Sequence, residues 1–109
     1  MSTWRGEDYC IDELRRMVRV EGVESKFAIE EIMTPELYDF ICQFHPDAIY
    51  QISWVTKTKQ RFYTIYRGEE VLRIIFRHII PRWARGEKIT PNKLKRSIGF
   101  KWKFLLIID

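Results

Sequence analysis

The sequence predicts a small α+β fold, with a mixed or antiparallel sheet of three to four strands and helices packed on one face. Several segments have apolar residues at three- and four-residue spacing, which is typical of amphipathic helices. Two runs rich in β-branched and aromatic residues flank a short polar stretch, and a third such run lies at the end of the chain. Strands interspersed with helices in this way indicate a sheet that helices cover on one side.

The first helix is predicted from an apolar stripe. Ile11, Leu14 and Val18 recur at the spacing of one helix face. They predict an amphipathic helix over residues 8–20, which Gly22 interrupts.

The segment that follows Gly22 is ambiguous. Residues 26–32 fit both the helical and the strand period, so the sequence does not decide between a helix and a strand there. The pair Thr34 and Pro35 then predicts a helix over residues 35–44, because a threonine side chain caps the first turn and proline fits the first helical position.

A β-hairpin is predicted in the middle of the chain. Residues 48–55 and 61–66 are dominated by β-branched and aromatic residues, and the polar residues 57–60 between them read as the turn. Alternation places three side chains on one face of the first strand: Tyr50, Ile52 and Trp54.

The last third of the chain predicts two helices and a strand. Apolar residues after Gly68 form a helical stripe, and Pro81 is expected to close that helix. A second threonine–proline pair, at residues 90–91, predicts a short helix that Gly99 ends. Residues 100–108 predict the final strand.

Length and composition indicate the class of protein. At 109 residues the chain has the usual size of one domain, so we expect a single domain over residues 1–109. Its longest apolar run, residues 104–108, is far shorter than the roughly 20 residues that span a bilayer. No secretory signal is recognisable, so we expect a cytoplasmic protein without a membrane partner. Cys10 and Cys42 are interpreted as reduced core residues, because secreted domains stapled by disulfides usually have four or more cysteines.

Motifs for catalysis and for metal binding are missing from the sequence. It has no Gly-rich phosphate loop, no G-x-S-x-G and no H-E-x-x-H. Cys42 and His45 could share a metal ion, but tetrahedral zinc needs two further ligands, and only Cys10 and His78 remain as soft candidates. We therefore predict no metal and no cofactor, and we favour a binding protein over an enzyme.

Charge is divided between the two parts of the chain. Residues 1–47 contain eleven Asp or Glu and five Lys or Arg, a net charge of −6. Residues 48–109 contain four acidic and fourteen basic residues, a net charge of +10. This asymmetry predicts a basic surface for nucleic acid or for an acidic protein, and the alternative is that the two parts pair across the fold.

The basic residues gather at the predicted hairpin and around the final strand. Alternation places Lys101 and Lys103 on one strand face, where a row of cations suits phosphate groups. Their neighbours Phe100, Trp102 and Phe104 are expected to point into the core rather than to stack on bases. We predict that nucleic acid, with DNA favoured over RNA, binds through the following side chains: Lys57, Lys59, Arg61, Arg67, Lys93, Lys95, Arg96, Lys101 and Lys103.

Residues 27–88 contain TPEL at 34–37 and RFYTIY at 61–66, and this segment resembles the distal part of a LAGLIDADG homing endonuclease repeat. The resemblance implies an αββαββα unit whose curved sheet sits in the DNA groove, with two units joined at a helix that ends in a metal-binding acid. At the place of that helix, residues 16–22 read RMVRVEG, in which only the final acid and glycine match. Glu21 is therefore the catalytic candidate. The resemblance implies a close contact between small residues of two such helices, which the bulky Arg and Met side chains here would prevent, so we expect no Mg²⁺-dependent cleavage.

Three functions remain open at this point. The first is a small nucleic-acid-binding protein that contacts the phosphate backbone through its basic C-terminal half without catalysis. The second is a protein-interaction module or inhibitor of viral or mobile-element type that acts on nucleic-acid machinery. The third is a degenerate LAGLIDADG-like endonuclease, a homodimer that brings two Glu21 side chains to one metal site.

Overall fold

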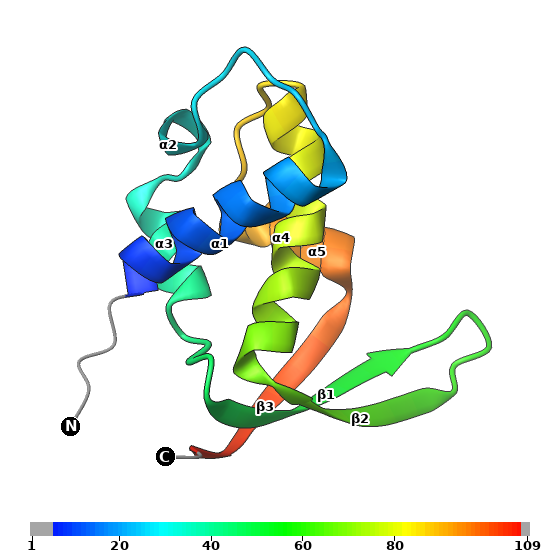
Figure 1. Cartoon of the computed structure of the whole chain (residues 1–109). Helices are drawn as coiled ribbons and strands as arrows, with labels where there is room; N and C mark the ends of the chain where they lie inside the picture. Colours follow the sequence, from blue (N-terminus) through cyan, green and yellow to red (C-terminus); the bar gives the residue numbers. More distant parts are fainter. Residues whose placement is uncertain (1–5, 108–109) are drawn as a thin grey trace.

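The computed structural model describes the backbone of residues 6–107, and it shows a three-stranded antiparallel sheet beneath a layer of helices (Figure 1). The predicted α+β class, with helices on one face of the sheet, is confirmed. The elements in chain order are α1 (Gly6–Glu21), α2 (Ile29–Ile32), α3 (Pro35–Ile41), β1 (Ala48–Val55), β2 (Arg61–Arg67), α4 (Gly68–Ala84), α5 (Pro91–Ile98) and β3 (Phe100–Ile107). Ile108, the last residue of the predicted final strand, lies outside the described residues.

The helix starts predicted at the two threonine–proline pairs, and the helix end predicted at Gly99, are confirmed by their caps, whereas α1 begins at Gly6 instead of residue 8. The Thr34 side chain accepts a hydrogen bond from the Leu37 amide at 3.2 Å, and Thr90 does the same for the Lys93 amide at 3.3 Å. Gly99 has a φ of 68° and ends α5 in the left-handed conformation that glycine adopts without strain. The ambiguous residues 26–32 contribute the short helix α2.

Helix α3 is shorter than predicted because a strand residue holds the chain that follows it. The helix ends at Ile41 instead of residue 44. The Tyr50 hydroxyl on β1 accepts a hydrogen bond from the His45 amide at 2.9 Å and donates one to the Gln43 carbonyl at 3.0 Å. These two bonds take up backbone groups on both sides of Phe44, which keeps the segment in a turn.

Helix α4 continues through Pro81 to Ala84, so the predicted end of this helix at Pro81 is wrong. Proline in a helix interior costs about 3 kcal/mol, because it lacks an N–H donor and crowds the preceding turn. Burial of Trp83 in the final turn offsets this cost. Its indole N–H donates to the Phe27 carbonyl at 2.8 Å, and its own carbonyl accepts from the Ser25 hydroxyl at 3.1 Å.

Strand β1 is the centre of the sheet, and its neighbours run antiparallel to it in the order β2-β1-β3. Ile52 lies opposite Thr64 of β2 and Trp102 of β3. Tyr50 and Ile52 are buried and Trp54 is half-buried against the core, so the predicted shared face is confirmed. This face of the sheet is turned toward the helices (Figure 1).

The core lies between the helices and that inner face of the sheet. Phe44 and Phe76 are the largest of its fully buried side chains, and Cys10 is buried in the same cluster, whereas Cys42 is half-buried. Within the described part of the chain, no helix has the length and apolar character that crossing a membrane requires.

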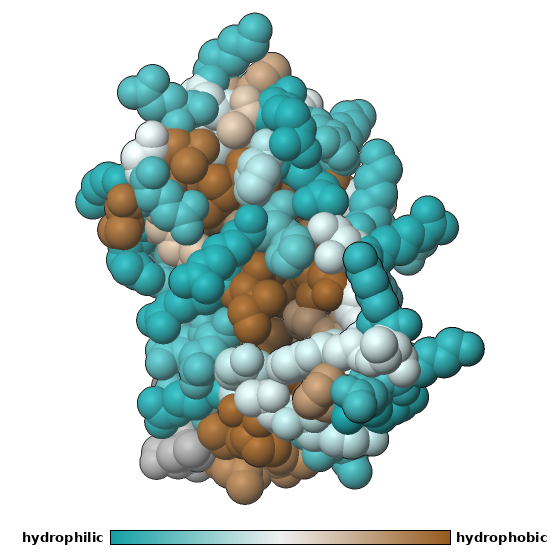
Figure 2. Space-filling model, turned by 90° about the vertical axis from the view of Figure 1, so that its right-hand side faces the viewer, coloured by the Kyte–Doolittle hydropathy of each residue, from teal (hydrophilic) through white to brown (hydrophobic). Residues whose placement is uncertain are grey.

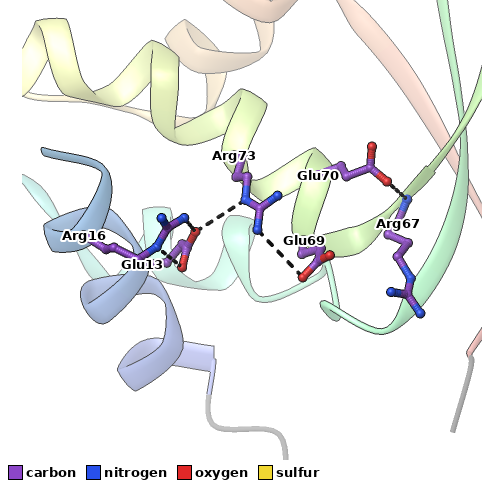
Figure 3. Close-up of polar contacts among 6 residues, drawn as sticks. All are labelled: Glu13, Arg16, Arg67, Glu69, Glu70 and Arg73. Atoms are coloured by element: carbon purple, nitrogen blue, oxygen red, sulfur yellow. Dashed lines mark hydrogen bonds and ion pairs between the residues drawn. The ribbon is translucent and has the colours of Figure 1, made fainter. Parts of the chain in front are cut away.

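Glu13 joins α1 to α4 (Figure 3). Its carboxylate pairs with Arg16 on its own helix and accepts a hydrogen bond from Arg73 of α4 at 3.5 Å. The hydrogen bond from Arg16 is the main cause that holds the pKa of Glu13 below its ordinary value of 4.5. The folded state favours the ionised form of Glu13, so its contacts with Arg16 and Arg73 stabilise the fold fully above pH 4.5. This contribution to stability is lost as the pH falls through the lower pKa that Glu13 has in the folded state.

We expect Glu13→Gln to lower the free energy of unfolding by about 1 kcal/mol at pH 7, because Arg16 and Arg73 lose the Glu13 carboxylate and Arg73 keeps only the longer contact with Glu69, at 4.0 Å. Urea denaturation between pH 7 and pH 3 measures the effect, and the difference from the native protein should shrink as the pH falls. Glu30→Gln is the matched control, since the pair of Glu30 with Arg15 is half-exposed on both sides. An equal loss in both variants would show that Glu13 has no special role.

Candidate nucleic-acid interface

The sheet has one face that no helix covers (Figure 1). We call it the outer face, and the strand registers define its members: Ile49, Gln51, Ser53 and Val55 of β1, Arg61, Tyr63, Ile65 and Arg67 of β2, and Lys101, Lys103 and Leu106 of β3. Leu106 belongs to this face because β3 has a bulge that brings it opposite Ile49.

Four predicted cations lie on the outer face: Arg61, Arg67, Lys101 and Lys103, all of them exposed. They lie on the two edge strands, whereas the central strand contributes only uncharged side chains to this face. The described outer face contains no Asp or Glu. It therefore presents positive charge on both sides of a neutral middle strand, which suits a polyanionic backbone.

These cations have no acidic partner within the described structure. Its ion pairs involve other arginines, on α1, on α4 and just after it: Arg15, Arg16, Arg73, Arg82 and Arg85. Figure 3 shows the Arg67 guanidinium pointing away from Glu70, whose carboxylate accepts instead from the Arg67 backbone amide. Between the acidic and basic parts of the chain, the described ion pairs make one link, Glu13 with Arg73. Among the described residues, the acidic and basic parts thus pair across the fold at this one place.

A small cavity opens where the three strands bring cations and a hydroxyl group together. It has a volume of about 130 Å³, and its lining includes Arg61, Ser53 and Lys101, one residue from each strand. Two cations and a hydroxyl donor around such a cavity are the groups that bind a phosphate oxygen.

The other predicted cations lie elsewhere. Lys57 and Lys59 are exposed in the hairpin turn, where Lys59 has a φ of 64°, and the hairpin projects beyond the helices (Figure 1). Lys93 and Arg96 are three residues apart on one side of α5 and are exposed. The Lys95 side chain points toward α3 instead, with its Nζ 5.5 Å from the centre of the Phe40 ring.

Lys95 and Lys101 line one shallow groove of about 370 Å³, together with Phe100 and Trp102. We call it the edge groove, because it follows the free edge of β3 beside α5. Lys95 of α5 thus shares a cavity with Lys101, a cation of the outer face.

The aromatic side chains of β3 follow the prediction in part. Phe100 and Trp102 are half-buried and pack against the core, as expected. Phe104 contacts Tyr50, with ring centres 5.9 Å apart, but is 53% exposed. The helices cover the sheet incompletely, and Figure 2 shows a hollow with an apolar floor between the helical part above and the sheet below.

The sequence interpretation missed several members of the outer face. Tyr63 and Ile65 are 60% and 57% exposed and lie between the two β2 arginines. The period-two alternation from Arg61 to Arg67 was a signal that could have identified them. Ser53 has no comparable signal, because its place opposite Lys101 depends on how β1 pairs with β3.

The catalytic candidate lies apart from the outer face. Glu21 is the exposed last residue of α1, in the helical layer. His78 is half-buried with its Nδ1 3.0 Å from the Ser97 hydroxyl, and burial, with a smaller contribution from Arg82, lowers the pKa of His78. Within residues 8–107, no three or more His, Cys, Asp or Glu side chains gather closely enough to hold a metal ion.

A further hollow of about 670 Å³ lies at the far end of α4, between its last turn and the loop that follows α1. Ser25 in its wall is already engaged, since its hydroxyl donates to the Trp83 carbonyl and accepts from the Phe27 amide. Glu24 and Lys26 are its charged lining residues. This lining offers no pair of like charges and no nucleophile with a base, so we place the candidate site on the outer face.

Comparison with known proteins found no matching family model, no matching curated protein and no matching solved structure. The segment that resembles a LAGLIDADG repeat, residues 27–88, forms α2, α3, the β1–β2 hairpin and α4. That resemblance stays a prediction.

Proposed function

We propose that this protein binds nucleic acid through the outer face and contacts the phosphate backbone without catalysing a reaction. The observation that carries the proposal is the set of four exposed cations on the uncovered face of the sheet, with no acidic residue among the described members of that face. Neutralising phosphates releases condensed counterions, which supplies most of the affinity of such surfaces.

A second candidate is an acidic protein partner, and the apolar members of the outer face favour it. Val55, Ile65 and Leu106 are each at least half exposed. Solvated faces of antiparallel sheets are usually polar, so exposed apolar side chains in this number indicate a surface that is covered when bound. Nucleic acid remains the first candidate, because bases and sugars also offer apolar surface beside their phosphates.

The salt dependence of binding tests the proposal. If the four cations each neutralise one phosphate, the logarithm of the association constant should fall with the logarithm of salt concentration with a slope of about −3 to −4. Fluorescence anisotropy with duplex DNA, single-stranded DNA and RNA of one sequence measures it. Polyglutamate of similar length is the control, since it has the charge of a polyanion without phosphates or bases.

Two results would count against the proposal. Binding that does not change with salt would show that phosphate contacts do not drive it. Polyglutamate binding as tight as that of every nucleic acid would favour the acidic protein partner.

A further inference from the structure

The edge groove has a wall of aromatic side chains that the core holds in place. The Trp102 ring contacts Phe40 of α3 with centres 5.7 Å apart at 72°, and it contacts Phe44 at 5.1 Å. Phe100 stands nearly perpendicular to Trp102, at 6.0 Å and 81°. These neighbours fix the orientation of the indole, and Trp102 and Phe100 are nevertheless half-exposed in the groove.

Cations connect this groove to the outer face. Lys101 lies on the outer face opposite Ser53, and it also lines the edge groove. Lys95 of α5 also lines the groove, and the described lining contains no acidic residue. A chain of phosphates that follows the outer face can therefore pass Lys101, turn around the free edge of β3 and continue to Lys95.

On the basis of the proposed function, we propose that the edge groove takes up an unpaired base, so that the protein prefers single-stranded nucleic acid to duplex. The bases of a duplex are stacked and paired inside the helix, where a groove wall of this kind does not reach them. In a single strand each base is free to rotate away from its neighbours and to contact Trp102 or Phe100. Contact of one base with an aromatic side chain strengthens binding by roughly 5- to 150-fold.

Substitution of the groove wall tests this inference. Trp102→Leu should weaken binding of oligo(dT) by about tenfold or more and leave binding of a duplex of equal length unchanged. Phe62→Leu is the matched control, because Phe62 is a 45% exposed aromatic residue on β2, the other edge strand, and does not line the edge groove. Tyr63→Leu asks whether the exposed aromatic residue of the outer face stacks on bases instead.

Trp102 also packs against the core, so two further measurements keep the test decisive if its substitution unfolds the protein. Lys95→Gln changes an exposed groove residue and should weaken oligo(dT) binding more than duplex binding. Photocrosslinking of the unaltered protein to 5-iodouracil oligonucleotides should modify residues 100–102 when the oligonucleotide is single-stranded and not when it is duplex.

The possible failures are distinguishable. Equal affinity for single strands and duplex, or crosslinks from single strands that avoid residues 100–102, would overturn the groove inference and leave the proposed function standing. If the protein showed no salt-dependent binding to any of the nucleic acids, both the groove inference and the proposed function would be overturned.

Discussion

Removal of all four cations of the outer face is expected to weaken nucleic-acid binding by about a thousandfold at moderate salt. The changes are to glutamine, at Arg61, Arg67, Lys101 and Lys103. A surface charge contact contributes about 1 kcal/mol, so four lost contacts amount to about 4 kcal/mol. The salt slope should flatten by about three to four units, since each lost phosphate contact removes about 0.9 of a unit on duplex DNA. Anisotropy titrations at several salt concentrations measure both quantities.

The matched control makes the same change of net charge in the helical layer and its connecting loops, with glutamine at Arg19, Lys26, Arg77 and Lys88, all of them exposed. If net charge alone governs binding, the two quadruple variants will be equally weak, and the outer face will lose its special role. Both variants should stay folded, because exposed charges contribute little to stability. Thermal unfolding should therefore accompany each titration.

The largest effect on stability is expected from Gly68→Ala, at the junction of β2 and α4. A Cβ atom at this position would lie 1.7 Å from the His45 carbonyl oxygen and 3.2 Å from the Pro46 Cα. Both neighbouring atoms belong to the backbone, so rotation of a side chain cannot relieve the clash with the added Cβ atom. The same segment is held by hydrogen bonds from the Glu69 amide to the Pro46 carbonyl at 3.1 Å and from the Ala48 amide to the His45 carbonyl at 3.0 Å. We expect a loss of about 3 kcal/mol or more in the free energy of unfolding, measured by urea denaturation.

Gly22→Ala is the control for this prediction. Gly22 has a φ of 67°, but a Cβ there would meet no atom within 4 Å. Its substitution should cost about 1 to 2 kcal/mol from backbone strain alone. A loss at Gly68 no greater than the loss at Gly22 would show that the turn at His45 yields easily, and the close approach would not be a constraint on the fold.

Local signals predicted most element boundaries. Thr34 and Thr90 cap helices where the sequence indicates, because a capping hydroxyl bonds an amide only three residues away. The bounds of β1 agree with the predicted strand over residues 48–55. Alternation also placed Lys101 and Lys103 on one face, since this period is a property of any extended strand.

Long-range contacts decided the elements that the sequence left open or misplaced. Helix α4 passes through Pro81 because Trp83 is buried and its indole N–H is hydrogen-bonded to the carbonyl of Phe27, 56 residues earlier in the chain. Helix α3 stops early because Tyr50 binds the turn that follows it. Each of these contacts outweighs the local preference for where the helix ends. The sequence of the helix itself does not show which distant residue makes the contact.

The candidate site divides in the same way. The sequence by itself determined which side chains carry the positive charge, and which of them share a strand face, because composition and alternation are local properties. The tertiary structure decided that β2 and β3 flank β1, so that Arg61, Ser53 and Lys101 line one cavity. It also decided that α5 lies beside the free edge of β3, where Lys95 and Trp102 form one groove. Strand pairing and helix docking depend on which apolar faces bury one another, and no single segment of the chain contains that information.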